Sequence, residues 1–168
     1  GHRFRCFKRA GHGVVDLVRS IAESCDVYYY ILGEQLGIEN LVHYARDVFG
    51  LGEKTGIEIA ENPGLIPSER WYRRHRFGVQ PGFALNTAVG QGDVRITPLA
   101  LARAYAALVN GGRLLRPRLV AAIKDPETGR YVPTEAEVQR VLDIPQDHVE
   151  TVMTGLLGAV NNEQGTAA

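Results

Sequence analysis

The sequence has few serines, only two cysteines and no long apolar run. It contains three serines among 168 residues, at Ser20, Ser24 and Ser68. No stretch approaches the roughly 20 consecutive apolar residues that span a bilayer, so no membrane-spanning helix is expected within the chain. Two cysteines cannot form a framework of several disulfides, which excludes the small secreted folds that depend on one. One disulfide bridge, a metal site and two free thiols all remain open on this evidence.

An excess of charge of one sign is also lacking. Nineteen lysines and arginines balance nineteen aspartates and glutamates, so the formal net charge is zero. This balance removes any whole-chain electrostatic attraction to polyanions, and no nucleic-acid partner is expected. The chain is 45% hydrophobic and 23% charged, which is typical of a folded globular protein. Neither end has the features of a domain boundary or a signal peptide, so we expect a piece of a longer protein.

The spacing of apolar and turn residues predicts a mainly helical chain with one small β-hairpin, an α+β fold class. The expected helices cover 13–23, 26–37, 41–50, 97–110 and 145–160, with a short basic segment at 68–76. Thr97 followed by Pro98 is a strong helix start. The expected hairpin strands are 119–123 and 130–132. A glycine-spaced loop is expected at 81–92, and residues 56–59 form either a strand or an extended loop.

Ser24-Cys25-Asp26 places a hydroxyl and a carboxylate two residues apart at the expected start of a helix. The ordinary explanation is helix capping, and the tripeptide alone is too short to be specific. Its surroundings favour a functional role. The accompanying motifs are Gly11-His12-Gly13, Val27-Tyr28-Tyr29-Tyr30, Phe49-Gly50-Leu51-Gly52, Gly64-Leu65-Ile66-Pro67-Ser68, Gly90-Gln91-Gly92 and Thr97-Pro98-Leu99-Ala100.

In this order the motifs closely resemble the middle of the transpeptidase domain of class B penicillin-binding proteins, over almost the whole chain. The Gly-His-Gly and Ser-Cys-Asp motifs favour the elongation type, like penicillin-binding protein two, over the division type. The resemblance implies the α+β fold shared by penicillin-binding proteins and serine β-lactamases. It also implies that residues 1–168 are a partial, central segment of that domain, without the regions that carry the other two catalytic motifs.

The activity implied by the resemblance is that of a D,D-transpeptidase, which cross-links peptidoglycan stem peptides and is acylated by β-lactams. Its chemistry needs no cofactor and uses three motifs, Ser-x-x-Lys, Ser-x-Asn/Asp and Lys-Thr/Ser-Gly. The second motif maps onto this chain: Ser24 would relay protons between the two motif lysines, and Asp26 would orient the substrate backbone. The parent protein is expected in the periplasm, anchored in the inner membrane by a segment absent here, with a membrane glycan polymerase of the elongation machinery as its partner.

The other two motifs can be checked directly. The residues three positions after the serines are Glu23, Val27 and Trp71, so the chain contains no Ser-x-x-Lys and no nucleophile. Lys54-Thr55-Gly56 spells the third motif but lies within a glycine-rich turn, and we expect Lys54 to be a solvated turn residue. The chain alone is therefore expected to be inactive.

Cys6, His12 and Cys25 form a second group of interest, because two thiolates and an imidazole suit zinc. In some elongation-type relatives a zinc site lies beside the active site, and the resemblance implies that His12 and Cys25 are ligands. Cys6 falls where such relatives carry another ligand, often an aspartate, and the last ligand would precede residue 1. The alternatives are a Cys6–Cys25 disulfide in an oxidising periplasm, or a buried thiol with a turn histidine.

Three further expectations complete the sequence evidence. The cluster of Arg70, Arg73, Arg74, His75 and Arg76 could grip an anionic partner, but a solvated, salt-bridged surface is favoured. Relatives usually have Asp-Thr where this chain has Phe83-Ala84, which argues against a polar role for that loop. Two other functions stay under consideration, a non-catalytic scaffold with the same fold and a zinc-stabilised helical interaction module.

Overall fold

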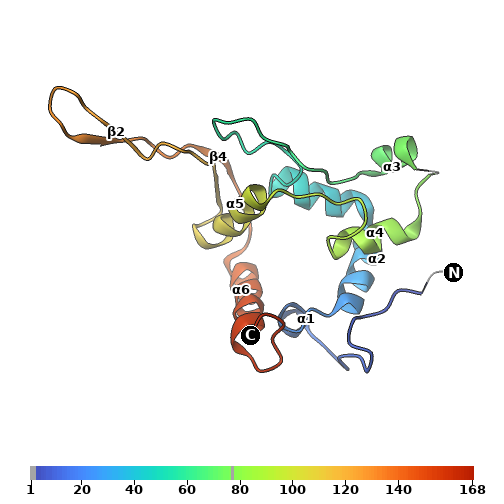
Figure 1. Ribbon diagram of the computed structural model, residues 1–168. Helices are drawn as coiled ribbons and strands as arrows, with labels where there is room; N and C mark the ends of the chain where they lie inside the picture. The colour runs from blue at the N-terminus through green and yellow to red at the C-terminus, as the bar shows by residue number, and fades with distance from the viewer. Residues whose placement is uncertain (1–2, 77) are drawn as a thin grey trace. The chain divides into compact units, whose positions relative to one another are not determined.

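The computed structural model describes residues 3–76 and 78–168, and the chain divides into two compact units. Gly1–Val42, Pro67–Val94 and Ile144–Ala168 make up the first unit, and His43–Ile66 and Arg95–Asp143 make up the second. Both units are drawn in Figure 1. None of the described helices is long and apolar enough to cross a membrane.

Every element of regular secondary structure among the described residues of the first unit is a helix. Its helices are α1 (Leu17–Ala22), α2 (Asp26–Val42), α3 (Glu69–His75), α4 (Pro81–Ala88) and α6 (Gln146–Asn161). Helix α1 packs against α6, and α2 packs against α4. Asp16 caps α1 by accepting a hydrogen bond from the Arg19 amide at 2.8 Å, and Ser68 caps α3 through the Trp71 amide at 3.2 Å. Side-chain oxygens therefore set the start of both short helices.

Glycines allow close approach in both helix pairs. A Cβ atom on Gly33 of α2 would lie 2.6 Å from the Ala88 Cβ of α4, and one on Gly155 of α6 would lie 2.8 Å from the Ile21 Cβ of α1. Both separations are shorter than van der Waals contact. The absence of a side chain at these two positions thus sets how closely the paired helices pack.

The second unit combines helices with four short strands. Its elements are the π-helix η1 (His43–Val48), α5 (Pro98–Val109), β1 (Arg113–Leu115), β2 (Ala122–Lys124), β3 (Tyr131–Pro133) and β4 (Val138–Val141). Strand β1 pairs antiparallel with β4, and β2 pairs antiparallel with β3. Together these strands form a narrow ribbon that extends away from α5 (Figure 1). Leu65 and Arg95 add an isolated antiparallel bridge.

Arg103 of α5 lies at the centre of this unit, with only 8% of its surface exposed. Its guanidinium donates to the Thr55 carbonyl at 3.1 Å, the Gln139 side-chain oxygen at 2.7 Å and the Gly50 carbonyl at 3.3 Å. Burial lowers the pKa of Arg103 from its usual value. One arginine therefore ties α5, β4 and the glycine-rich loop after η1 together.

The α+β fold class predicted from the sequence is confirmed. Helix α5 begins as predicted, with the Thr97 hydroxyl accepting from the Ala100 amide at 3.2 Å, and α6 and the β2–β3 hairpin lie within a few residues of their predicted ranges. The expected break at Gly37 is present as a single residue with a φ of 72°, after which the helix continues to Val42. Residues 56–59 form a loop rather than a strand.

The prediction of a loop throughout 81–92 is wrong, because α4 occupies Pro81–Ala88. The Phe83 ring stacks on Tyr72 of α3 at a centroid distance of 4.0 Å, and Tyr72 is 1% exposed. A packing role for Phe83 thus accounts for an apolar residue at this position. The pairing of β1 with β4 was not predicted.

Candidate functional site

The Ser24-Cys25-Asp26 motif forms the turn between α1 and α2. The Ser24 amide donates to the Ile21 carbonyl at 3.3 Å, and the Cys25 amide donates to the Ser20 carbonyl at 3.0 Å. Ser24 has a φ of 53°, and no other non-glycine residue in the described chain has a positive φ. An L-residue in this conformation costs about 1–2 kcal/mol. The turn therefore keeps a serine where glycine would be less strained.

The Ser24 side chain is exposed. Across residues 3–76 and 78–168, no hydrogen bond engages its hydroxyl. Asp26 lies in the first turn of α2, and its Oδ2 accepts the Phe7 amide at 3.2 Å. Neither side chain caps α2, so the ordinary explanation for this motif does not account for the observed contacts. Within the part of the chain that the structure describes, the arrangement leaves a solvent-accessible hydroxyl beside a carboxylate whose second oxygen accepts no hydrogen bond.

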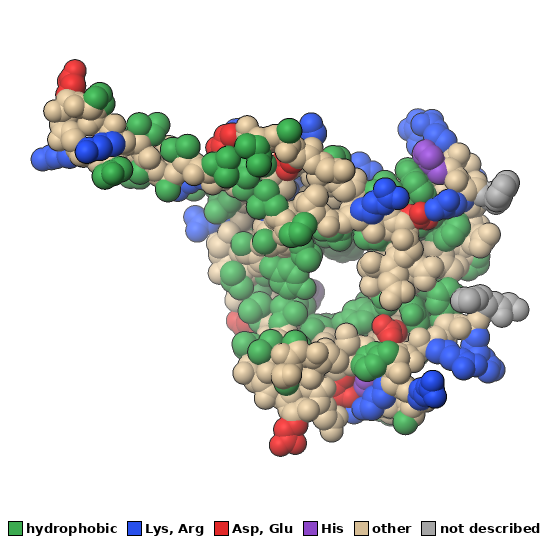
Figure 2. Space-filling view, in the orientation of Figure 1, with side chains coloured by type: hydrophobic (Ala, Val, Ile, Leu, Met, Phe, Trp, Pro, Cys, Tyr) green, Lys and Arg blue, Asp and Glu red, His purple; other side chains and the backbone are tan. Residues whose placement is uncertain are grey.

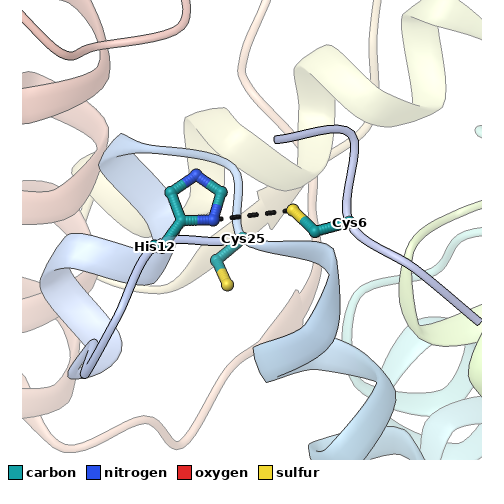
Figure 3. A group of neighbouring side chains, drawn as sticks. All are labelled: Cys6, His12 and Cys25. Atoms are coloured by element: carbon teal, nitrogen blue, oxygen red, sulfur yellow. Dashed lines mark hydrogen bonds between the residues drawn. The ribbon is translucent and has the colours of Figure 1, made fainter. Parts of the chain in front are cut away.

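Cys6, His12 and Cys25 come together beside this turn, as the sequence predicted. Their ligand atoms all lie within 4.8 Å of one another, and Cys6 Sγ is 3.5 Å from His12 Nδ1. Figure 3 shows Cys6 and His12, on the loop before α1, joined by their contact, with Cys25 nearby at the residue before α2. His12 and Cys25 are buried and Cys6 is half-buried. Both cysteines are free thiols.

These three residues fit zinc by donor type, and one of their separations also matches a zinc site. Zinc binds thiolate sulfur at about 2.3 Å and imidazole nitrogen at about 2.0–2.1 Å, so a tetrahedral site places sulfur and nitrogen about 3.6 Å apart. The Cys6–His12 separation of 3.5 Å matches that edge. Two sulfur ligands and one nitrogen also favour zinc over the oxygen-seeking magnesium and calcium ions.

Glu23 is a buried acid next to this cluster that the sequence did not single out. Its Oε2 is 3.9 Å from His12 Nε2 and 3.7 Å from Lys8 Nζ, and its Oε1 is 2.5 Å from Arg19 Nε. The hydrogen bond from Arg19 holds the pKa of the Glu23 carboxyl below its usual range. The signal available in the sequence was the i, i+4 spacing of Arg19 and Glu23, which predicts an ion pair on one helix.

The Lys54-Thr55-Gly56 triplet lies in a loop of the second unit. Lys54 is exposed, whereas Thr55 is fully buried and donates its hydroxyl to Glu61 at 2.8 Å. The Gly56 amide donates to the same carboxylate at 2.7 Å. These contacts agree with a solvated lysine in a structural turn, and the triplet does not lie on a strand as the third catalytic motif would.

Figure 2 shows Arg and His side chains gathered over α3. Arg73 pairs with Glu69 at 3.0 Å, and Arg76 pairs with Asp93. The His75 ring stacks on Trp71 at a centroid distance of 4.6 Å. These internal partners favour the interpretation of a solvated, salt-bridged surface.

The family model for the penicillin binding protein transpeptidase domain matches residues 1–168. The peptidoglycan D,D-transpeptidase MrdA of Acinetobacter baumannii is 39% identical over 123 residues, covering 72% of this chain and 18% of that protein. Stage V sporulation protein D of Bacillus subtilis is 35% identical over 170 residues, covering 100% of this chain and 25% of that protein. The chain therefore spans a quarter or less of the length of these relatives.

A solved structure supports the same relationship. The structure of Pseudomonas aeruginosa PBP2 in complex with WCK 5153 matches with a TM-score of 0.80 at 33% identity, over 99% of this chain and 37% of that one. Sequence and fold thus agree with the resemblance first noted in the motifs. The chain belongs to the transpeptidase-domain family of the penicillin-binding proteins, and within it to the PBP2/MrdA type.

Proposed function

We propose that this chain is the central part of a peptidoglycan D,D-transpeptidase that cross-links stem peptides and is acylated by β-lactams. The names of the MrdA relatives support this activity. The observation that carries the proposal is the Ser24 hydroxyl, exposed on a strained turn at the position of the family's second motif. Backbone strain at a polar residue that does not cap a helix is typical of functional sites.

The proposed roles follow from the chemistry of the two side chains. Acyl transfer through a covalent intermediate requires a proton to leave the nucleophile and another to reach the leaving amine. A serine hydroxyl both donates and accepts, so Ser24 Oγ can pass a proton between two basic groups on either side of it. Asp26 Oδ2 is held by the Phe7 amide, and its other oxygen can accept an N–H group from the substrate backbone. The nucleophile and both motif lysines would come from outside these residues.

The proposal also implies a location and partners. The protein would act in the periplasm, anchored in the inner membrane by a segment outside this chain, and a membrane glycan polymerase of the elongation machinery would be its partner. One solved neighbour is a complex of Helicobacter pylori PBP2 with MreC. Another, at 36% identity and a TM-score of 0.68, is titled as the structural coordination of polymerization and crosslinking by a peptidoglycan synthase complex. Both titles describe assemblies, and they support the proposal that the parent protein acts with a partner.

A fluorescent penicillin should distinguish the proposed enzyme from a non-catalytic scaffold. The transpeptidase that contains this chain is expected to become labelled at about one penicillin per molecule, because acylation forms a covalent ester. The 168-residue chain alone is expected to stay unlabelled, since it contains no Ser-x-x-Lys. The readout is gel fluorescence against protein mass. Labelling of the chain alone would contradict the assignment of the nucleophile, and an unlabelled parent would favour the scaffold.

We further propose that Cys6, His12 and Cys25 hold a structural zinc ion, with the fourth ligand from the protein before residue 1. When bound, zinc would supply a cross-link between the loop before α1 and the start of α2. The three residues would hold the Ser24 turn through that link, and acyl transfer itself would need no cofactor. Their separations and their burial support the site.

Elemental analysis of the parent protein, purified under reducing conditions, tests this site. About one zinc per chain is expected, and Cys25→Ser and His12→Asn should each lose most of it, because a structural zinc site of four ligands is strongly weakened when one ligand is removed. His148→Asn is the matched control, because His148 is exposed and distant in sequence from the cluster. Zinc content unaffected by Cys25→Ser would reject the site, and a Cys6–Cys25 disulfide found by mass spectrometry in place of zinc would support the alternative.

A further inference from the structure

We infer that Glu23 is the positioning residue for His12 in metal binding, a role that rests on the zinc site proposed above. The inference concerns the second nitrogen of the imidazole ring. Nδ1 of His12 faces Cys6 Sγ at 3.5 Å, while Nε2 faces Glu23 Oε2 at 3.9 Å. The ring thus presents one nitrogen to the thiols and the other to a carboxylate.

This division of the two nitrogens determines which one can bind a metal. A neutral imidazole carries its proton on one nitrogen and offers the lone pair of the other. A carboxylate beside Nε2 favours the proton there, which leaves the Nδ1 lone pair free to bind a metal held by the two sulfurs. A closer approach of about 1 Å would make the Nε2–Glu23 contact a hydrogen bond. Carboxylate partners of this kind orient ligating histidines and raise their basicity.

The Glu23 carboxylate is itself held in place. Arg19 donates from Nε to Oε1 at 2.5 Å and from Nη2 to Oε2 at 3.4 Å, a two-point contact. A third donor of the same guanidinium, Nη1, bonds the Val14 carbonyl at 2.9 Å. Val14 lies two residues after His12 in the same loop. Arg19 therefore links the carboxylate to the segment that carries the imidazole.

An ordinary solvent-exposed ion pair between Arg19 and Glu23 would not account for the burial of the Glu23 carboxylate beside His12. Such pairs lie on the outer face of a helix and contribute little. Here the Glu23 side chain is 8% exposed and that of His12 is 2% exposed. The Phe7 ring covers the imidazole edge-on at a centroid distance of 5.6 Å. A buried carboxylate against a buried imidazole is expected to act on that ring, since little water separates them.

The experiment compares wild-type parent protein with Glu23→Gln, which keeps size and shape but removes the charge. Zinc affinity is measured by competition with a chromophoric chelator, and the ligand set by the absorption of the cobalt-substituted protein. Glu23→Gln should bind zinc about 10- to 100-fold more weakly while the sulfur-to-cobalt bands persist. Long-range proton–nitrogen NMR should show the His12 Nε2 proton signal displaced in the variant. Glu34→Gln, an exposed acid on α2, is the matched control and should change neither quantity.

Arg19→Gln serves as a second variant in case Glu23→Gln unfolds. This variant keeps the Glu23 carboxylate but removes the guanidinium that holds it in place. Its loss of zinc affinity is therefore expected to be smaller than that of Glu23→Gln. If zinc binding depends on Cys25 but the Glu23→Gln variant binds zinc as tightly as wild type, the inference about Glu23 is overturned while the proposed zinc site stands. A changed cobalt coordination number would also overturn it, because Glu23 would then be a ligand. Zinc retained by Cys25→Ser would reject the site itself and the inference with it.

Discussion

Replacing Ser24 by alanine is expected to slow β-lactam acylation of the transpeptidase that contains this chain by about 10²- to 10⁴-fold, the usual effect of removing an acid–base group. The hydroxyl makes no hydrogen bond within the described residues, so its loss should leave stability nearly unchanged. The rate is measured from the time course of fluorescent penicillin labelling. Ser68→Ala is the control, since the Ser68 hydroxyl caps α3, and its loss should affect stability rather than acylation.

Ser24→Gly separates function from folding at the same position. Glycine adopts a positive φ without a steric penalty, so this variant should be as stable as wild type or more stable by up to about 1 kcal/mol. Its acylation rate should fall as far as that of Ser24→Ala, because both variants lack the hydroxyl. Full acylation activity in either variant would rule out the proposed proton relay. A large loss of stability in Ser24→Gly would contradict the strain at this turn.

Replacing Arg103 by methionine is expected to destabilise the second unit by about 3 kcal/mol. The variant keeps most of the side-chain volume but removes donors to three oxygens. The Gly50 carbonyl would lose its arginine partner in a buried place, and unsatisfied buried polar groups cost about 1–3 kcal/mol each. Gln139 still donates to the Thr55 carbonyl at 3.1 Å, so that oxygen would keep one partner.

Urea unfolding combined with amide hydrogen exchange measures this effect and locates it. Faster exchange is expected in the loop after η1 and in α5, since Arg103 joins these segments. Arg130→Met is the matched control, because Arg130 is exposed on the hairpin turn. Equal stability of the two variants would show that Arg103 does not organise this unit.

The fold could be predicted where short-range chemistry determines it. Thr97 and Pro98 define the start of α5 because a cap and a first-turn proline act within a few residues. Helix α4 could not be predicted in the same way: its Pro81-Gly82 start resembles a turn, and stacking of Phe83 on Tyr72 joins it to α3. Strand β1 has only three residues, and its bulged pairing with β4 depends on a distant segment.

The candidate site could likewise be predicted only in part. The family motifs indicated Cys6, His12 and Cys25, and the fold brings them together. Their metal and the catalytic roles of the neighbouring motif stay predictions. Glu23 could not be found from its sequence neighbours alone, since its contact with His12 depends on how the loop returns over α1. The positive φ of Ser24 likewise follows from the hydrogen bonds that end α1 and not from any residue preference.

The missing side chain at Gly33 has a consequence for how this family can vary. Because a Cβ there would lie 2.6 Å from the Ala88 Cβ, the two positions have room for only one methyl-sized group between them. A larger residue at either position would require α2 and α4 to move apart, and α2 begins with the motif aspartate, Asp26. Substitutions in this helix pair are therefore expected to be coupled to the geometry of the Ser24 turn.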